Sequence, residues 1–264
     1  VTVEHPEFRR SRKIEDRLGT LVRDEVGRAL AAPEIAPHVV ATSARLSING
    51  LASSAAGARP AQVLAVDPLD EARFSTLDDQ VVDGRYLEPD DRLAVYIGVG
   101  LAASLELRLG SRVVVQAQDA HQEIAAQLLR VVGIFESGVP EIDQAVVHMP
   151  LTTAGEWLGS GADVTNVGVV LSDSGVVADV SAQLEATLRD PVGRGEARVM
   201  GWREANPALA AAIAIDDFGN YLVFGILFLI IAFGIVNTVL MSVLNRHREF
   251  GVLRALGLTP GQTG

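Results

Sequence analysis

The sequence has 264 residues, enough for one large domain or for a mid-sized domain with an added segment. Its net charge of −11 excludes the basic face that non-specific nucleic-acid binding requires, so we expect no nucleic-acid partner. Cysteine is absent, which excludes disulfides, thiolate metal sites and cysteine nucleophiles. Because the chain starts at Val1 with no initiator Met, we expect a fragment of a longer protein.

The first part of the chain mixes helical and strand patterns. Residues 11–31 carry apolar side chains at helical spacing, including Ile14, Leu18 and Leu21, with Ser11 as a candidate N-cap and Pro33 after the end. A second helix is predicted over 178–189, and strands over 38–48, 61–66, 92–97, 112–118, 125–135, 166–172 and 196–202, with 112–118 and 125–135 forming a hairpin. This mixture predicts an α+β domain.

The stretch IGVGLAA (97–103) has the G-x-G-x-x-A outline of a dinucleotide-binding turn, with Asp119 about twenty residues on. A dinucleotide-dependent enzyme is therefore one hypothesis. The residues that follow predict a short helix and a hairpin rather than a crossover helix and a parallel strand. We expect Gly98 and Gly100 to shape a turn and Leu101 and Leu105 to pack in the core.

Other chemistry-bearing residues form no recognisable constellation. The five histidines are scattered without metal-ligand spacing, and no nucleophile elbow or Walker A sequence occurs. The acidic pairs Asp78/Asp79 and Asp90/Asp91 are typical of solvated turns. We expect no catalytic residue, metal or cofactor, and no enzymatic activity in this chain.

A long helix is predicted from Asn206-Pro207, with Asn as N-cap and Pro at the first helical position. Its residues 221–244 carry no charge, and at about 1.5 Å per residue they extend roughly 36 Å, enough to cross a bilayer. The alternative is a buried helix in a soluble core. Asp216 and Asp217 precede the run, whereas Arg246, Arg248 and Arg254 follow it, which predicts a cytoplasmic C-terminal end and residues 1 to about 215 outside.

One face of this helix carries small and polar side chains. They are Gly234, Asn237, Thr238 and Met241, continued by Asn245. Polar groups inside a bilayer are costly unless they face protein, so we expect this stripe to pack against partner helices.

The segment FGIVNTVLMSVLNRHREFGVLRALGLTPGQ (233–262) resembles the second transmembrane helix and following segment of FtsX-like ABC-transporter permeases, of the MacB and lipoprotein-releasing LolC/LolE group. The segment VVDGRYLEPDDRLAVYIGVGLAASLELRLGSRVVV (81–115) is similar to the outer domain of that group. The resemblance implies a MacB-like extracytoplasmic core over 1–206, with a porter-like subdomain (1–70 and 160–206) and an inserted β-rich subdomain (71–159). It also implies a stalk and transmembrane helix over 207–245, a cytoplasmic coupling segment over 246–264, and first, third and fourth membrane helices outside this sequence.

The resemblance further implies that the coupling segment docks on a cytoplasmic ABC ATPase. Carried over by position, the contact residues are Arg248, Glu249, Phe250, Gly251, Leu253, Arg254 and Gly257. Phe250 and Leu253 would form an apolar anchor, and Gly257 can end the helix. The alternative is an amphipathic stretch that lies on the anionic inner leaflet.

By this resemblance the chain is a permease subunit in the bacterial inner membrane that couples ATP hydrolysis by a partner to motion of the outer domain. It would export or release a lipoprotein or another hydrophobic substrate. Expected partners are the ATPase, a second or sister permease, membrane lipid and a lipoprotein chaperone or periplasmic adaptor. The alternative is a non-transporting signalling permease that activates cell-wall hydrolases.

Overall fold

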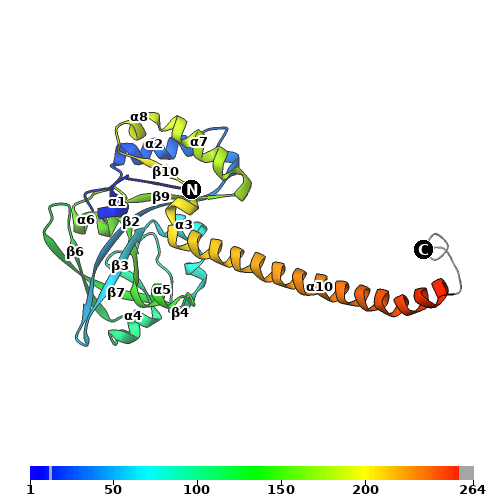
Figure 1. Ribbon diagram of the computed structural model, residues 1–264. Coiled ribbons are helices and arrows are strands. Elements are labelled where there is room, and N and C mark those ends of the chain that lie inside the picture. The colour runs from blue at the N-terminus through cyan, green and yellow to red at the C-terminus, as the bar shows by residue number, and fades with distance from the viewer. Residues whose placement is uncertain (12–13, 256–264) are drawn as a thin grey trace. The chain divides into compact units, whose positions relative to one another are not determined.

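The computed structural model describes residues 1–11 and 14–255, with the backbone alone at 217, 245–251 and 253–255. The chain divides into two compact units, 1–205 and 206 onward. The first unit holds β1 to β10 and α1 to α9, and the second contains α10 (Figure 1).

The strands are β1 (Thr2–Glu4), β2 (Val39–Ser54), β3 (Gly57–Val66), β4 (Val81–Gly84), β5 (Ala94–Gly98), β6 (Arg112–Gln118), β7 (Ile124–Phe135), β8 (Val146–Pro150), β9 (Asn166–Leu171) and β10 (Arg198–Met200). The α-helices are α1 (Phe8–Ser11), α2 (Thr20–Leu30), α3 (Pro68–Phe74), α4 (Val99–Ser104), α5 (Pro140–Ala145), α6 (Leu151–Leu158), α7 (Val177–Thr187), α8 (Arg189–Gly193), α9 (Trp202–Ala205) and α10 (Pro207–Ala255). Short 3-10 turns are η1 (Ala36–His38), η2 (Leu77–Asp79) and η3 (Ser174–Val176). This composition confirms the α+β class.

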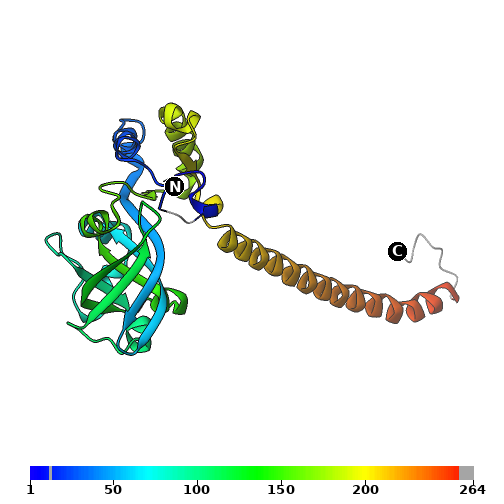
Figure 2. The ribbon, with the colours of Figure 1, turned by 90° about the vertical axis from the view of Figure 1, so that its left-hand side faces the viewer.

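Part of the sheet closes on itself. The pairings run β2–β3–β8–β5–β7–β6, and β6 returns to β2, so these strands form a closed ring. The pairs β3–β8 and β5–β7 are parallel, and the other pairs of the ring are antiparallel. The predicted hairpin is present as β6 and β7, with Arg112 opposite Arg130 and Gln118 opposite Ile124. Figures 1 and 2 show the ring strands curving together below α2 and α7.

Strand β2 joins the ring to a flatter part of the sheet. Its first half, Val39 to Arg45, pairs with β9, and β1 and β10 continue the sheet from there. Its second half, Gly50 to Ser53, pairs with β6 and closes the ring. One strand therefore serves two neighbouring sheets, each with its own core.

Three apolar clusters stabilise the unit. The ring encloses side chains from all of its strands. It is closed by Leu101 of α4, by Leu105 directly after α4 and by Leu158 of α6. A second cluster lies between the flat sheet and α2 and α7, and a third covers the outside of β5 and β8 with residues such as Leu87 and Tyr96. The ring core contains Leu46 and Val113, from either side of the predicted 70/71 boundary, and the division into porter-like and inserted subdomains stays a prediction.

The predicted helix over 11–31 is wrong in its first half. The helix α2 begins at Thr20, and Ser11 ends the short helix α1 instead of capping a long one. Leu18 is extended, because its backbone exchanges hydrogen bonds with Val164 at 2.7 and 3.1 Å. The Asp163 carboxylate then accepts the backbone N–H of Thr20 at 2.8 Å, so a residue far away in sequence caps the helix. Leu21, predicted on the apolar face, is 81% exposed.

A buried ion pair anchors α3 to β2 where the two sheets meet. Glu71 of α3 is fully buried and accepts hydrogen bonds from Ser43 Oγ at 2.6 Å and from Arg45 Nε at 2.8 Å. The Arg45 guanidinium also lies 4.2 Å from the ring centroid of Phe74. Phe74 packs so closely on Gly168 of β9 that a Cβ there would lie 2.5 Å from its ring. No local sequence pattern predicted this network.

His148 lies fully buried among aromatic rings on the outside of the ring. Its ring centroid is 6.3 Å from those of Tyr86 and Phe135 and 6.4 Å from that of Tyr96. Neither ring nitrogen has a hydrogen-bond partner within the described residues. Burial without a partner favours the neutral ring, and it lowers the pKa of His148 to about 4.

We predict that His148→Phe removes part of the acid sensitivity of folding. The pKa of His148 is about 6.5 in an unfolded chain and about 4 in the fold, because burial lowers it more than Glu71 raises it, and Arg45 lowers it further. Between these values the unfolded chain binds the extra proton, so the free energy of unfolding falls as the pH is lowered, by about 3 kcal/mol in all. The loss on acidification should be smaller by about that amount in the variant.

Urea denaturation near neutral pH and near pH 4 measures this difference. Fluorescence of Trp157, which packs on the ring core, reports unfolding in a Trp202→Phe background. An equal loss of stability in the parent and in His148→Phe would contradict the prediction.

Candidate membrane-spanning and coupling helix

The helix α10 begins at Pro207, as predicted. The carbonyl of Asn206 accepts the N–H of Ala210 at 2.9 Å, which places Asn206 in the N-cap position. Pro207 lacks an N–H, but the first N–H groups of a helix have no intrahelical acceptor in any case. No further proline occurs up to Ala255, so the helix continues for 49 residues, about 74 Å at 1.5 Å per residue.

The segment Pro207–Leu244 is the one helix among the described residues that is long and apolar enough to cross a membrane. Its most apolar window has a mean hydropathy of 2.6, and none of that window is buried in the protein. Large side chains such as Phe228 and Ile230 are at least 60% exposed. A core helix of a soluble domain would bury such side chains, so the alternative of a soluble core helix does not fit these residues.

The predicted stripe lies on one side of α10. Successive residues of a helix are about 100° apart, which places Gly234, Asn237, Thr238 and Met241 within an arc of about 100°. The Thr238 hydroxyl donates to the Gly234 carbonyl at 2.9 Å, so this hydroxyl is satisfied within its own helix. The side chain of the stripe that still requires hydrogen-bond partners inside a membrane is therefore the Asn237 amide, which is exposed. Packing of this stripe against partner helices stays a prediction.

The predicted coupling residues follow on the same helix. The backbone is helical through the predicted boundary between 245 and 246 and as far as Ala255. Phe250 and Leu253 are three residues apart and therefore share a side of the helix, whereas Val252, which is 61% exposed, lies on another side. Side-chain positions at 248–251, 253 and 254 are not described, and Gly257 lies outside the described residues.

The glycines of IGVGLAA make a close helix contact. Both glycines lie against α5. A Cβ on Gly98 would lie 2.3 Å from the Asp143 carbonyl oxygen, and a Cβ on Gly100 would lie 2.8 Å from Gln144 Cγ, which are both too close for a side chain. Leu101 and Leu105 are buried in the ring core, as expected. The backbone of α5 thus occupies the space beside this turn, and the glycines allow α4 and α5 to pack closely.

Asp91, one of the acidic residues noted in the sequence, has a structural role. Asp91 binds Arg85 through two hydrogen bonds of 2.7 Å and accepts the Glu88 N–H at 2.8 Å, so it organises its turn. The Arg85 guanidinium beside it lowers the pKa of the Asp91 carboxyl. Among the described residues, no group of three or more His, Asp or Glu side chains has the arrangement of a metal site.

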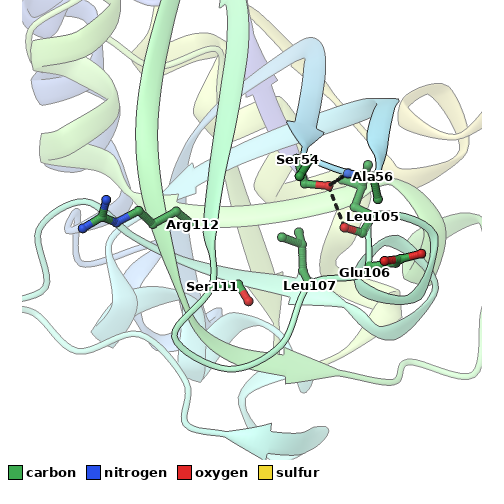
Figure 3. Close-up of a pocket in the computed structure, with 8 residues that line it drawn as sticks. Ser54, Ala56, Leu105, Glu106, Leu107, Ser111 and Arg112 are labelled. Carbon is green, nitrogen blue, oxygen red and sulfur yellow. Dashed lines mark hydrogen bonds between the residues drawn. The ribbon is translucent and has the colours of Figure 1, made fainter.

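A surface hollow of about 260 Å³ lies between the tip of the β2–β3 hairpin and the end of α4 (Figure 3). Ser54 Oγ donates to the Leu105 carbonyl at 2.6 Å and accepts the Ala56 N–H at 3.1 Å, so these polar groups bind one another. Arg112 points away from them. None of the predicted site residues lies here, and α10 remains the candidate site.

Two family models match the chain. The MacB-like periplasmic core domain matches residues 6–187, and the FtsX-like permease C-terminal model matches residues 221–264. The lipoprotein-releasing system transmembrane protein LolC of Neisseria meningitidis is 24% identical over 229 residues, which are 84% of this chain and 54% of the relative. An uncharacterized ABC transporter permease of Methanocaldococcus jannaschii is 25% identical over 67% of this chain and 43% of its own length. The chain thus spans about half the length of these relatives.

Solved structures share the fold of the first unit. The extracellular domain of the noncanonical ABC-type transporter YknZ, from Gram-positive bacteria, has a TM-score of 0.53 at 17% identity and covers 76% of this chain and all of that domain. The periplasmic region of MacB from Actinobacillus actinomycetemcomitans has a TM-score of 0.52 at 14% identity and covers 79% of this chain and 91% of that region. Together with the family models, which match both parts of the chain, they confirm the resemblance seen in the sequence. The chain belongs to the FtsX-like ABC transporter permeases that carry a MacB-like periplasmic core domain.

Proposed function

We propose that this chain is part of an ABC transporter permease in which α10 transmits motion between a cytoplasmic ATPase and the outer domain. The observation that carries the proposal is the continuity of α10. It begins at Pro207, directly after the MacB-like unit, and it continues without a break into the segment that matches the FtsX-like permease model.

The length of α10 supports this role. Its uncharged residues 221–244 account for about 36 Å, which leaves about 21 Å of helix before them and about 16 Å after them. A helix that crosses a hydrocarbon core of about 30 Å therefore has at least two turns on either side. A proline-free helix resists bending, so displacement of one end moves the other.

The charges that flank the apolar run of α10 support one orientation. Asp216 and Asp217 precede the apolar run, and Arg246, Arg248 and Arg254 follow it. By the positive-inside rule, residues 1 to about 215 lie outside the bacterial inner membrane and the coupling segment lies in the cytoplasm.

In this proposal the last turns of α10 bind the ATPase. Phe250 and Leu253 fill an apolar groove, and Arg248, Glu249 and Arg254 contact its polar rim. Gly251 allows the ATPase to approach the helix backbone closely, and Gly257 allows the helix to end. The competing arrangement, with the segment on the anionic inner leaflet, uses the same charges but needs no partner protein.

The substrate in this proposal is a lipoprotein or another hydrophobic molecule released from the inner membrane. Support comes from the relative in Neisseria meningitidis, which belongs to a lipoprotein-releasing system. A second or sister permease supplies the remaining helix contacts, and a chaperone or periplasmic adaptor receives the substrate. A signalling permease would instead use residues 1–206 to bind a soluble cell-wall hydrolase.

Single cysteines test the orientation, because the chain has no cysteine of its own. We expect Ala211→Cys to react with a membrane-impermeant maleimide in intact spheroplasts. Gln262→Cys should react only after the membrane is opened. Labelling in the reverse order would contradict the proposed topology.

Substitutions at the coupling segment test the ATPase contact. We expect Phe250→Ala with Arg254→Ala to lower substrate-stimulated ATP hydrolysis about tenfold or more in proteoliposomes, because anchor residues carry most of an interface's energy. Val252→Ala, about 200° from Phe250 around the helix, is the matched control and should keep normal turnover. Assembly should partly survive in both. Normal turnover in the double variant would favour the membrane-surface arrangement.

Rigidity of α10 is tested at Gly219, where a Cβ would meet no atom within 4 Å. Gly219→Pro removes a backbone hydrogen bond and kinks α10. Gly219→Ala fits without a clash and favours the straight helix. We expect Gly219→Pro to uncouple basal ATP hydrolysis from substrate release and Gly219→Ala to keep them coupled. Equal release by the two variants would show that a continuous rod is not required.

A further inference from the structure

One face of the ring is left uncovered by the described residues of the first unit. It is the outer side of the strands β2, β6 and β7, whose inner side chains fill the ring core. The outer side of β5 and β8 is different, because the segment around Leu77 to Leu87 packs over it. The uncovered face consists of Leu51, Val114, Gln116, Gln118, Ile124, Ala126 and Leu128.

These residues form rows across the strands without a single charge. Gln116 lies opposite both Leu51 of β2 and Ala126 of β7, and Val114 lies opposite Leu128. Ile124 is 82% exposed, although a side chain of this size gains free energy when it is buried. In a protein with net charge −11, an uncharged sheet face of this size indicates a contact surface.

The charges at the two ends of this face are opposite in sign. At one end Arg112 and Arg130 lie directly opposite each other, a like-charge pair that destabilises a sheet by itself. Within the described residues, neither guanidinium has a carboxylate within ion-pair distance, and Arg130 donates to the Gly110 carbonyl at 3.2 Å. At the other end the β6–β7 turn carries Asp119 and the exposed Glu123.

We infer that this face binds the same face of a second copy of the chain. A two-fold axis that runs across the strands, between the two sheets, places the arginine end of each copy over the acidic turn of the other. An axis along the strands would instead place arginines against arginines. The first arrangement pairs the charges and matches the isologous symmetry of most dimers. The row of Gln116 and Ala126 lies halfway along the face, and each residue of this row meets its own counterpart.

The size of the face indicates a weak contact. Strands of seven residues at about 3.3 Å per residue, spaced about 4.8 Å apart, present roughly 300 Å² per copy. The total of roughly 600 Å² is below the 1,200 Å² or more of stable interfaces, so the contact needs the two copies to be held together. The inference thus rests on the proposed function, in which membrane helices hold paired permeases side by side and raise the effective concentration.

Disulfide cross-linking of single-cysteine variants in membranes tests the interface. We expect Ala126→Cys to give a cross-linked dimer on mild oxidation, because facing sheets about 10 Å apart allow inter-sheet disulfides. Gln183→Cys, on the exposed side of α7, is the matched control and should remain monomeric on the same gel. Equal cross-linking of the two variants, or cross-linking of Ala126→Cys to a different protein alone, overturns the inference.

Charge reversal tests the orientation of the two copies. In the Ala126→Cys background, Arg112→Glu with Arg130→Glu should reduce cross-linking to the level of the control. Adding Glu123→Arg should restore part of it, because opposite charges again face each other. Cross-linking that ignores these charges overturns the two-fold arrangement. The coupling assay is read separately. No cross-linking of the Ala126→Cys parent, with intact ATPase stimulation, rejects this interface alone. Lost ATPase stimulation in the coupling variants, with intact cross-linking, rejects the coupling proposal alone.

Discussion

The first unit depends on the shared use of strand β2. Its 16 residues give hydrogen bonds to β9 at one end and to β6 at the other, and β3 follows most of its length. Side chains from different parts of this one strand therefore lie in different environments. Leu46 and Ala52 lie in the ring core, whereas Ser43 and Arg45, nearer its start, bind α3. Because both sheets pair with one strand, neither can be displaced without breaking backbone hydrogen bonds of the other.

The ion pair of Arg45 and Glu71 lies where β2 passes from one sheet to the next. A buried carboxylate is costly unless it is paired and hydrogen-bonded, and Glu71 satisfies this with Ser43 and Arg45. Removal of one partner would leave an uncompensated charge inside the fold. The pair therefore determines where α3 lies on β2, and with it the packing of Phe74 on Gly168 of the neighbouring strand.

Local patterns predicted those elements that local interactions stabilise. The helix α10 follows from its cap, its missing prolines and its apolar run, and the β6–β7 hairpin follows from two β-rich segments around a short polar turn. The predicted start of α2 was wrong, because the helix begins only after Leu18 and Thr20 have bound Val164 and Asp163, which are about 145 residues away in the sequence. Closure of the ring through β2 and β6 and the buried state of His148 are equally non-local. For the candidate site, the backbone of the coupling segment was predictable, whereas its contacts depend on a partner surface that this sequence does not contain.

A weak contact between outer domains suits a machine driven from the other side of the membrane. A ligand or partner can shift a two-state equilibrium only by its differential free energy for the two states, which for coupled sites is typically about 1–3 kcal/mol. A large apolar interface between the outer domains would exceed this and would lock one state. An uncharged contact that buries roughly 600 Å² over both copies, with charges at its ends, lies nearer that range, so a displacement carried by α10 could separate or join the two copies. The proposed contacts through Asn237 and through the sheet face would then meet the same requirement. Each must be strong enough to align two permeases and weak enough to change with each ATPase cycle.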